Sequence, residues 1–125
     1  MPKKTWLLAA VGWSVITVIL CLVQFSNIPQ VGIPSADKYV HSIFHFLFTI
    51  FWFLHFDATS NRKVVSNVIL VLVLSFLFGV AIEFAQAIFT TSRKAEVADV
   101  IANLYGALAG VFTLFVIQFL KPKKQ

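Results

Sequence analysis

The sequence predicts an all-α integral membrane protein, a bundle of four transmembrane helices. The chain is 59% hydrophobic and only 12% charged, whereas about a quarter of the residues in an ordinary soluble domain are charged. Four apolar segments each approach the roughly 20 residues that are needed to cross a bilayer core. These segments fill most of the chain, so we expect a single membrane domain over residues 1–125.

The first two segments are expected to be helices over about 5–25 and 38–56. The first contains Cys21, the only cysteine, which cannot form an internal disulfide and should pack as a small apolar residue. No small-residue cleavage pattern ends this segment, so we expect a retained helix. The second segment is short and carries all three histidines, but without it a largely apolar loop of about 40 residues would remain.

The last two segments are expected to be helices over about 64–90 and 97–120. A short polar loop, "TTSRKAE", separates them, and the basic tail "KPKKQ" follows the second of them. The longer loop "SNIPQVGIPSAD" precedes the second helix of the chain and should be irregular, because it holds two prolines and a glycine. Ser35 or Asp37 at its end can cap that helix.

Charge sets the expected orientation. A net charge of +5 would suggest nucleic acid as a partner of a soluble protein, but no nucleic-acid-binding motif occurs here, and the basic residues lie in loops and tails. With the N-terminus inside, seven of the ten Lys and Arg residues are cytoplasmic, and only Lys38, Arg93 and Lys94 are outside. The positive-inside rule therefore predicts a multi-pass protein with both termini in the cytoplasm.

Polar and small residues form a stripe on one face of each of the last three helices. The spacing of i, i+4, i+7 or i+8 keeps each set on one side of its helix. The stripes are Asp37, His41, His45 and Thr49; Gly79, Glu83, Gln86 and Thr90; and Asp99, Asn103, Gly106 and Gly110. Their most polar members fall in the predicted outer half, which indicates an outward-facing polar pocket between the three helices.

Glu83 is the least expected residue of these stripes, since it lies about two turns inside an apolar segment. A charged side chain at a helix centre costs about 2.5–3.5 kcal/mol on insertion scales, and less toward the interface. A hydrogen bond between helices in a membrane contributes only about 0.6 kcal/mol. Helix association is therefore an inefficient reason to keep this acid, and we favour a functional site.

The residue types in the stripes suit acid–base chemistry. Asp37 can orient His41 as a general base, while Glu83 and Asp99 supply partly desolvated carboxyl groups. A simple interfacial pair and an N-cap are the structural alternatives for Asp37–His41 and Asp99. His41, Glu83 and Asp99 could also form part of a metal site. We favour no metal site and expect no cofactor, because neither HExxH nor a Cys/His cluster is present.

Three stretches carry these residues in order: "DKYVHSIFHF", "GVAIEFAQ" and "SRKAEVADVIANLYGALAG". In this combination, over about residues 35–110, the chain resembles the VanZ-like family, named for a teicoplanin-resistance protein. The proline that often follows the family's Glu-x-x-Gln is absent. The family pattern matches Asp37, Lys38, His41, Glu83, Gln86, Arg93, Asp99, Asn103, Gly106 and Gly110. The resemblance implies a bacterial cytoplasmic membrane and a link to glycopeptide resistance or cell-envelope work, without a settled reaction.

Two functions stay open at this point. In the first, the chain catalyses hydrolysis or transfer on a lipid-linked envelope substrate. The predicted catalytic residues are then Asp37, His41, Glu83 and Asp99, and the substrate-binding residues are Lys38, Gln86, Arg93 and Asn103. In the second, the pocket binds a lipid headgroup, a glycopeptide or a partner protein without chemistry, since no nucleophile motif such as GxSxG occurs.

Two further expectations concern transport and assembly. Transport is disfavoured because no polar path is expected to continue through the inner half of the bundle. Gly106 and Gly110 form a GxxxG element, which lets helices approach closely. Packing within the bundle is the favoured use of these glycines, and a homo-oligomer contact is the alternative.

Overall fold

The computed structural model describes residues 3–22, 36–89 and 97–120. These residues form four α-helices and no strand: α1 (Lys3–Leu22), α2 (Ala36–Thr59), α3 (Val64–Phe89) and α4 (Val97–Leu120). Each helix is long and apolar enough to cross a membrane. The prediction of an all-α membrane protein with four spanning helices is confirmed.

The helix bounds differ most from the prediction at the end of α2, which continues three residues beyond position 56. The hydroxyl groups of Thr59 and Ser60 donate hydrogen bonds to the carbonyl oxygens of His55 and Phe56, at 2.9 and 2.8 Å. These bonds add to the main-chain bond from the N–H of Ser60 to the carbonyl oxygen of Phe56, at 3.0 Å, and together they stabilise the longer end.

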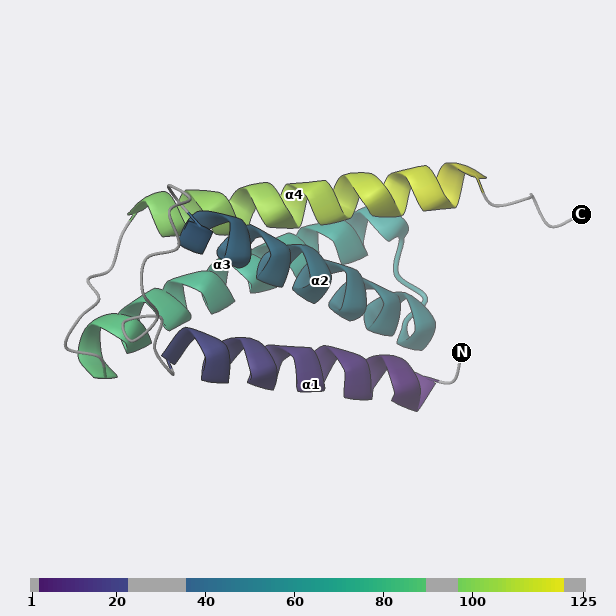
Figure 1. Cartoon of the computed structure of the whole chain (residues 1–125). Coiled ribbons are helices and arrows are strands. Elements are labelled where there is room, and N and C mark those ends of the chain that lie inside the picture. The colour runs from purple at the N-terminus through teal and green to yellow at the C-terminus, as the bar shows by residue number, and fades with distance from the viewer. Residues whose placement is uncertain (1–2, 23–35, 90–96, 121–125) are drawn as a thin grey trace, which may run out of the picture.

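The four helices run antiparallel to their neighbours in sequence (Figure 1). The first residue of α1 and the last residue of α4 lie at the same end of the bundle, which we call the proximal end. The opposite end, where α2 and α4 begin and α1 and α3 finish, is called the distal end. Helix α2 touches all three other helices and has its most extensive contact with α4.

Close approach of α2 and α4 depends on two glycines of α4. A Cβ atom on Gly106 would overlap the main chain of Ser42, and one on Gly110 would lie 3.0 Å from the carbonyl oxygen of Phe46. At the same interface the Ser42 hydroxyl donates to the carbonyl oxygen of Ala102 at 2.8 Å. The GxxxG element therefore packs helices within the bundle, which was its favoured use.

Two apolar clusters stabilise the bundle. The cluster nearer the proximal end consists of Phe53, Val68, Val71, Val111 and Leu114, contributed by α2, α3 and α4. A smaller cluster joins Cys21 of α1 to one residue each of α2 and α3. Cys21 thus packs as a small apolar residue, as expected.

The surface is apolar and much of the core is polar, which is the reverse of a soluble domain. Large apolar side chains are exposed on every helix, and lipid provides a matching environment for them. Among the residues that the structure describes, ten buried side chains are polar or charged: Thr17, His41, His45, Thr49, Asn67, Ser75, Glu83, Gln86, Asp99 and Asn103. Polar groups placed inside a membrane bundle are candidates for function.

Candidate functional site

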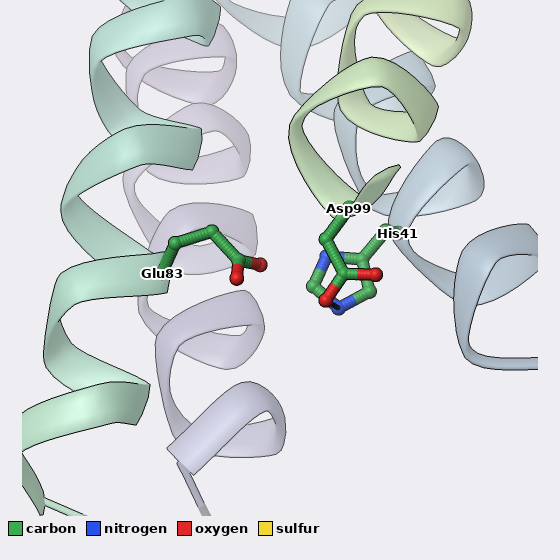
Figure 2. Close-up of side chains that lie close together, drawn as sticks. All are labelled: His41, Glu83 and Asp99. Carbon is green, nitrogen blue, oxygen red and sulfur yellow. Dashed lines mark ion pairs between the residues drawn. The ribbon is translucent and has the colours of Figure 1, made fainter. Parts of the chain in front are cut away.

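His41, Glu83 and Asp99 come together at the distal end, one from each of α2, α3 and α4 (Figure 2). One nitrogen or oxygen atom from each side chain lies within 4.8 Å of the corresponding atoms of the other two. All three residues are only 2–3% exposed. We call this group the distal cluster.

The antiparallel arrangement explains why these three residues meet. His41 lies in the second turn of α2, Asp99 in the first turn of α4, and Glu83 two turns before the end of α3. Helices that start and finish at the same end of a bundle place such positions at a similar depth. The N-terminus of α4 also favours a negative charge at Asp99.

Lys38 joins the distal cluster through an ion pair. Its Nζ atom lies 2.5 Å from Oδ1 of Asp99, and its side chain is 25% exposed. The other carboxylate oxygen of Asp99, Oδ2, lies 4.0 Å from Nε2 of His41. The two oxygens of Asp99 therefore face different partners: Oδ1 faces an ammonium group, and Oδ2 faces an imidazole ring.

Asn103 orients the His41 ring. Its Oδ1 atom lies 3.2 Å from Nδ1 of His41, in a buried contact between α4 and α2. An amide oxygen can only accept, so Nδ1 carries the proton in this arrangement. When the ring is neutral, Nε2 presents a lone pair toward Asp99, and when it is charged, Nε2 presents an N–H to Oδ2. Sequence analysis predicted Asn103 as a substrate-binding residue, and the structure places it as a partner of the predicted base.

Gly79 makes room for Asn103. A Cβ atom at this position would lie 2.6 Å from Nδ2 of Asn103 and 3.1 Å from Cε1 of His45. Both side chains can therefore approach the main chain of α3 only because residue 79 is glycine. Gly79 thus supports the orientation of His41 indirectly, through Asn103.

Gln86 binds α1 rather than the distal cluster. Its Nε2 atom donates to the carbonyl oxygen of Cys21 at 2.8 Å, and the residue is 1% exposed. This contact fixes α3 against α1, and the role of Gln86 in substrate binding stays a prediction.

Buried polar side chains continue toward the proximal end, which corrects the expectation that they stop halfway. Nδ1 of His45 lies 2.7 Å from Oγ of Ser75, and Thr49 is fully buried. Near the start of α3, Arg62 donates to Oδ1 of the fully buried Asn67 at 3.2 Å. Ser75 lies eight residues and Asn67 sixteen residues before Glu83, and this spacing drifts around the helix, so the stripe of Glu83 alone does not predict their burial.

Two predicted site residues cannot be placed. Asp37 belongs to α2, but its side chain lies outside the described part of the structure, and so does the whole of Arg93. Thr90, at the end of its stripe, is also outside. The roles of Asp37 as partner of His41 and of Arg93 as an anion-binding residue stay predictions.

A cavity of about 10 Å³ lies beside the cluster, between α3 and α4. It is lined by Ser75, Phe76, Val100, Asn103 and Leu104. This volume is close to what one water molecule needs and far below the roughly 300–1,000 Å³ of small-molecule sites. The polar side chains are therefore closely packed, and the outward-facing pocket stays a proposal.

The fold and the buried cluster define a class: a four-helix membrane protein that encloses titratable side chains at one end. A family model described as VanZ/LLP1 matches residues 5–118, and the chain belongs to this family. The match reaches beyond the 35–110 stretch of the sequence motifs and includes most of α1. No curated protein and no solved structure matches the chain.

Proposed function

We propose that this chain catalyses hydrolysis or group transfer on a lipid-linked substrate of the cell envelope by acid–base chemistry at the distal cluster. The observation that carries the proposal is the convergence of His41, Glu83 and Asp99 from three helices, with their nitrogen and oxygen atoms within 4.8 Å of one another. Titratable groups that are close together and desolvated are suited to exchanging protons with a substrate.

The contacts around His41 support the role of a proton acceptor. Asn103 occupies Nδ1, which leaves the lone pair of Nε2 on the side of the carboxylates. A water molecule or hydroxyl group held there transfers its proton to Nε2 as it attacks the substrate. The protonated ring is stabilised by Asp99 and returns the proton to the leaving group, so the cluster ends the cycle as it began.

Cationic residues at the distal end favour a substrate with phosphate. The Lys38 side chain is 25% exposed, and Asp99 holds it next to the cluster. Arg93 lies in the sequence between α3 and α4, in the predicted outer loop. An arginine there can bind phosphate oxygens in a bidentate manner. A lipid-linked phosphate would present its headgroup at this depth, while its tail stays among the exposed apolar side chains of the helices.

The membrane setting follows from the charge distribution and the family. The excess of Lys and Arg in the predicted inner segments supports a cytoplasmic location of both termini, with the distal end outside. The VanZ/LLP1 family match supports a bacterial cytoplasmic membrane and a contribution to glycopeptide resistance, teicoplanin in particular. Because the cluster is only 2–3% exposed, the substrate must displace packed side chains to enter.

The test compares wild type with Glu83→Gln, which keeps the shape of the side chain and removes the acid. Purified protein in detergent is incubated with a polyprenyl diphosphate-linked sugar, and product formation is followed by mass spectrometry. We expect turnover by wild type and a loss of about 10²- to 10⁴-fold in Glu83→Gln, with substrate binding retained. Asp57→Asn, which changes an exposed carboxylate at the proximal end, is the matched control and should keep full activity.

The second candidate function is binding without chemistry, and the close packing of the cluster favours it. If wild type binds the lipid-linked substrate, a lipid headgroup or teicoplanin but forms no product, and Glu83→Gln binds equally well, the catalytic proposal is wrong. Expression of both proteins in a teicoplanin-susceptible bacterium then decides whether binding alone raises the inhibitory concentration.

A further inference from the structure

We infer that the distal cluster binds one divalent transition-metal cation, of which Zn²⁺ is the expected example. The ligands are Nε2 of His41, a carboxylate oxygen of Glu83 and Oδ2 of Asp99. The inference builds on the proposed function, for which it names a cofactor, but binding of the cation can be measured without any substrate. It also departs from the sequence-based expectation that no metal is bound.

The donor set has the right chemistry and nearly the right size. Figure 2 shows the Glu83 side chain extending from α3 toward the ring of His41 and the carboxylate of Asp99. Their candidate atoms lie within 4.8 Å of one another, and the Nε2 to Oδ2 distance is 4.0 Å. Around tetrahedral Zn²⁺ with bonds of about 2.0–2.1 Å, two donors lie ~3.4 Å apart. The donor atoms must therefore approach one another by roughly 0.6–1.4 Å, and rotation of the Glu83 side chain can provide much of this movement.

The residues around the donors form an outer shell typical of metal sites. A metal-binding histidine usually donates its other N–H to an oxygen, which fixes its tautomer and ring orientation. Asn103 provides that oxygen for Nδ1 of His41. Ligating carboxylates are commonly held by a further hydrogen bond, and Lys38 holds Oδ1 of Asp99 while leaving Oδ2 directed at His41. Both contacts present the remaining donor atom toward the cluster centre.

Charge also favours a cation. With a neutral His41 ring protonated at Nδ1, Nε2 and Oδ2 of Asp99 are both acceptors, and they face each other at 4.0 Å in a buried setting. Acceptors in this position repel unless a proton or a cation lies between them. Two carboxylates and the Lys38 ammonium leave one net negative charge. A divalent cation converts this to one net positive charge, which suits a site for a phosphate group.

The ligand types narrow the choice of cation. Imidazole nitrogen favours Zn²⁺, Fe²⁺ and Ni²⁺ over Mg²⁺, while carboxylates accept all of them. Three protein ligands leave a fourth position for water, as in catalytic zinc sites. A coordinated water is more acidic than bulk water, so a bound cation would supply the nucleophile that hydrolysis needs, with His41 acting as a ligand rather than as a base.

The experiment uses the full chain, purified without a polyhistidine tag and stripped with a chelator. It is titrated with Co²⁺, whose visible absorption reports a low-coordinate site, and then with competing Zn²⁺ or Mg²⁺. We expect one equivalent of Co²⁺ to bind, Zn²⁺ to displace it and Mg²⁺ not to. His41→Gln and Glu83→Gln should weaken binding by more than about tenfold, and Asn103→Leu by about 10- to 100-fold through its effect on His41.

His55→Gln and Asp57→Asn are matched controls, because they remove the same residue types from the proximal half of α2. Both should bind Co²⁺ as wild type does. Absence of saturable binding by wild type, or equal losses in His55→Gln and His41→Gln, would overturn the inference. Zinc-induced stabilisation of wild type but not His41→Gln provides a second readout, should Glu83→Gln fail to fold.

The outcomes separate this inference from the proposed function. If wild type binds no cation while Glu83→Gln loses turnover, the chemistry is acid–base without a metal, and only the cation inference is wrong. If one cation binds with the expected dependence on His41 and Glu83 but no product forms, the cation site stands and the catalytic proposal is wrong.

Discussion

Helices α2, α3 and α4 meet through different kinds of side chain at the two ends of the bundle. Near the proximal end, α2, α3 and α4 meet through apolar side chains such as Phe53, Val71 and Leu114. At the distal end, the same three helices meet through the imidazole of His41 and the carboxylates of Glu83 and Asp99. The interhelical contacts are dominated by packing at the first end and by polar groups at the second.

This difference indicates which residues the fold needs. In lipid, apolar side chains associate mainly through close packing, because lipid tails are as apolar as the protein interior. At the proximal end these helices meet mainly by packing, with the polar Asn67 buried next to Val68 in the sequence. Charged residues at the distal end make insertion more costly, so their presence there is better explained by a ligand or a reaction than by helix association. The following variants test this contrast, from the largest expected effect to the smallest.

Gly106→Ala should disrupt both ends at once. The added Cβ atom would overlap the main chain of Ser42, which cannot move away as a side chain can. We expect α2 and α4 to separate and the folded protein to be lost, measured by yield and by monodispersity in detergent. Gly12→Ala is the matched control, because a Cβ atom at Gly12 has nothing within 4 Å. Folded Gly106→Ala with wild-type stability would contradict the α2–α4 packing.

Phe53→Ala should weaken the proximal end alone. This side chain is 1% exposed within the apolar cluster, and its truncation leaves a cavity that costs about 3–5 kcal/mol in comparable cores. The thermal midpoint should fall clearly, whereas Co²⁺ affinity at the distal end should stay unchanged in the fraction that is folded. Phe119→Ala, at a position 89% exposed, controls for loss of a phenylalanine and should change neither quantity.

Gly79→Ala should alter the distal cluster at a smaller cost in stability. The new Cβ atom would meet the Asn103 amide, which can shift, so we expect about 1–3 kcal/mol of destabilisation. Displacement of Asn103 removes the contact that orients His41, and Co²⁺ affinity should fall by about tenfold or more. Unchanged affinity would show that the Asn103 contact does not position the ring.

Trp13→Phe should have the smallest effect. The change removes the hydrogen bond from Nε1 to the carbonyl oxygen of Phe44, at 2.9 Å, but keeps an aromatic ring against Phe44. Hydrogen bonds between membrane helices contribute about 0.6 kcal/mol on average, so the thermal midpoint should fall only slightly. A loss as large as that of Phe53→Ala would show that polar contacts stabilise this bundle as strongly as packing does.

Much of the fold could be predicted because it depends on local sequence. The lengths of the apolar segments predicted the number and approximate bounds of the helices. Steps of three and four residues identified the faces that carry His41, Glu83 and Asp99. GxxxG predicted close packing at Gly106, although its partner, Ser42 of α2, has no marker in the sequence. Which helix lies against which is a tertiary property, and spacing along one helix does not contain it.

The contacts within the site could not be predicted from the sequence for the same reason. The pairing of Lys38 with Asp99 joins residues 61 positions apart, and Gln86 finds its acceptor on α1. Asn67 and Ser75 were overlooked because single small polar residues in an apolar segment carry little signal. Steps of four drift around a helix, so their burial becomes evident only once the neighbours of α3 are known.

The central claim is that Glu83 serves a ligand or a reaction and not the fold. The most direct test is the thermal midpoint of wild type and Glu83→Gln, purified in detergent and measured with chelator present, so that no bound cation contributes to stability. We predict that Glu83→Gln is as stable as wild type or more stable, because it removes a buried acid and keeps the shape. A loss of several degrees, or failure to fold, would contradict the claim and make Glu83 a structural contact between helices.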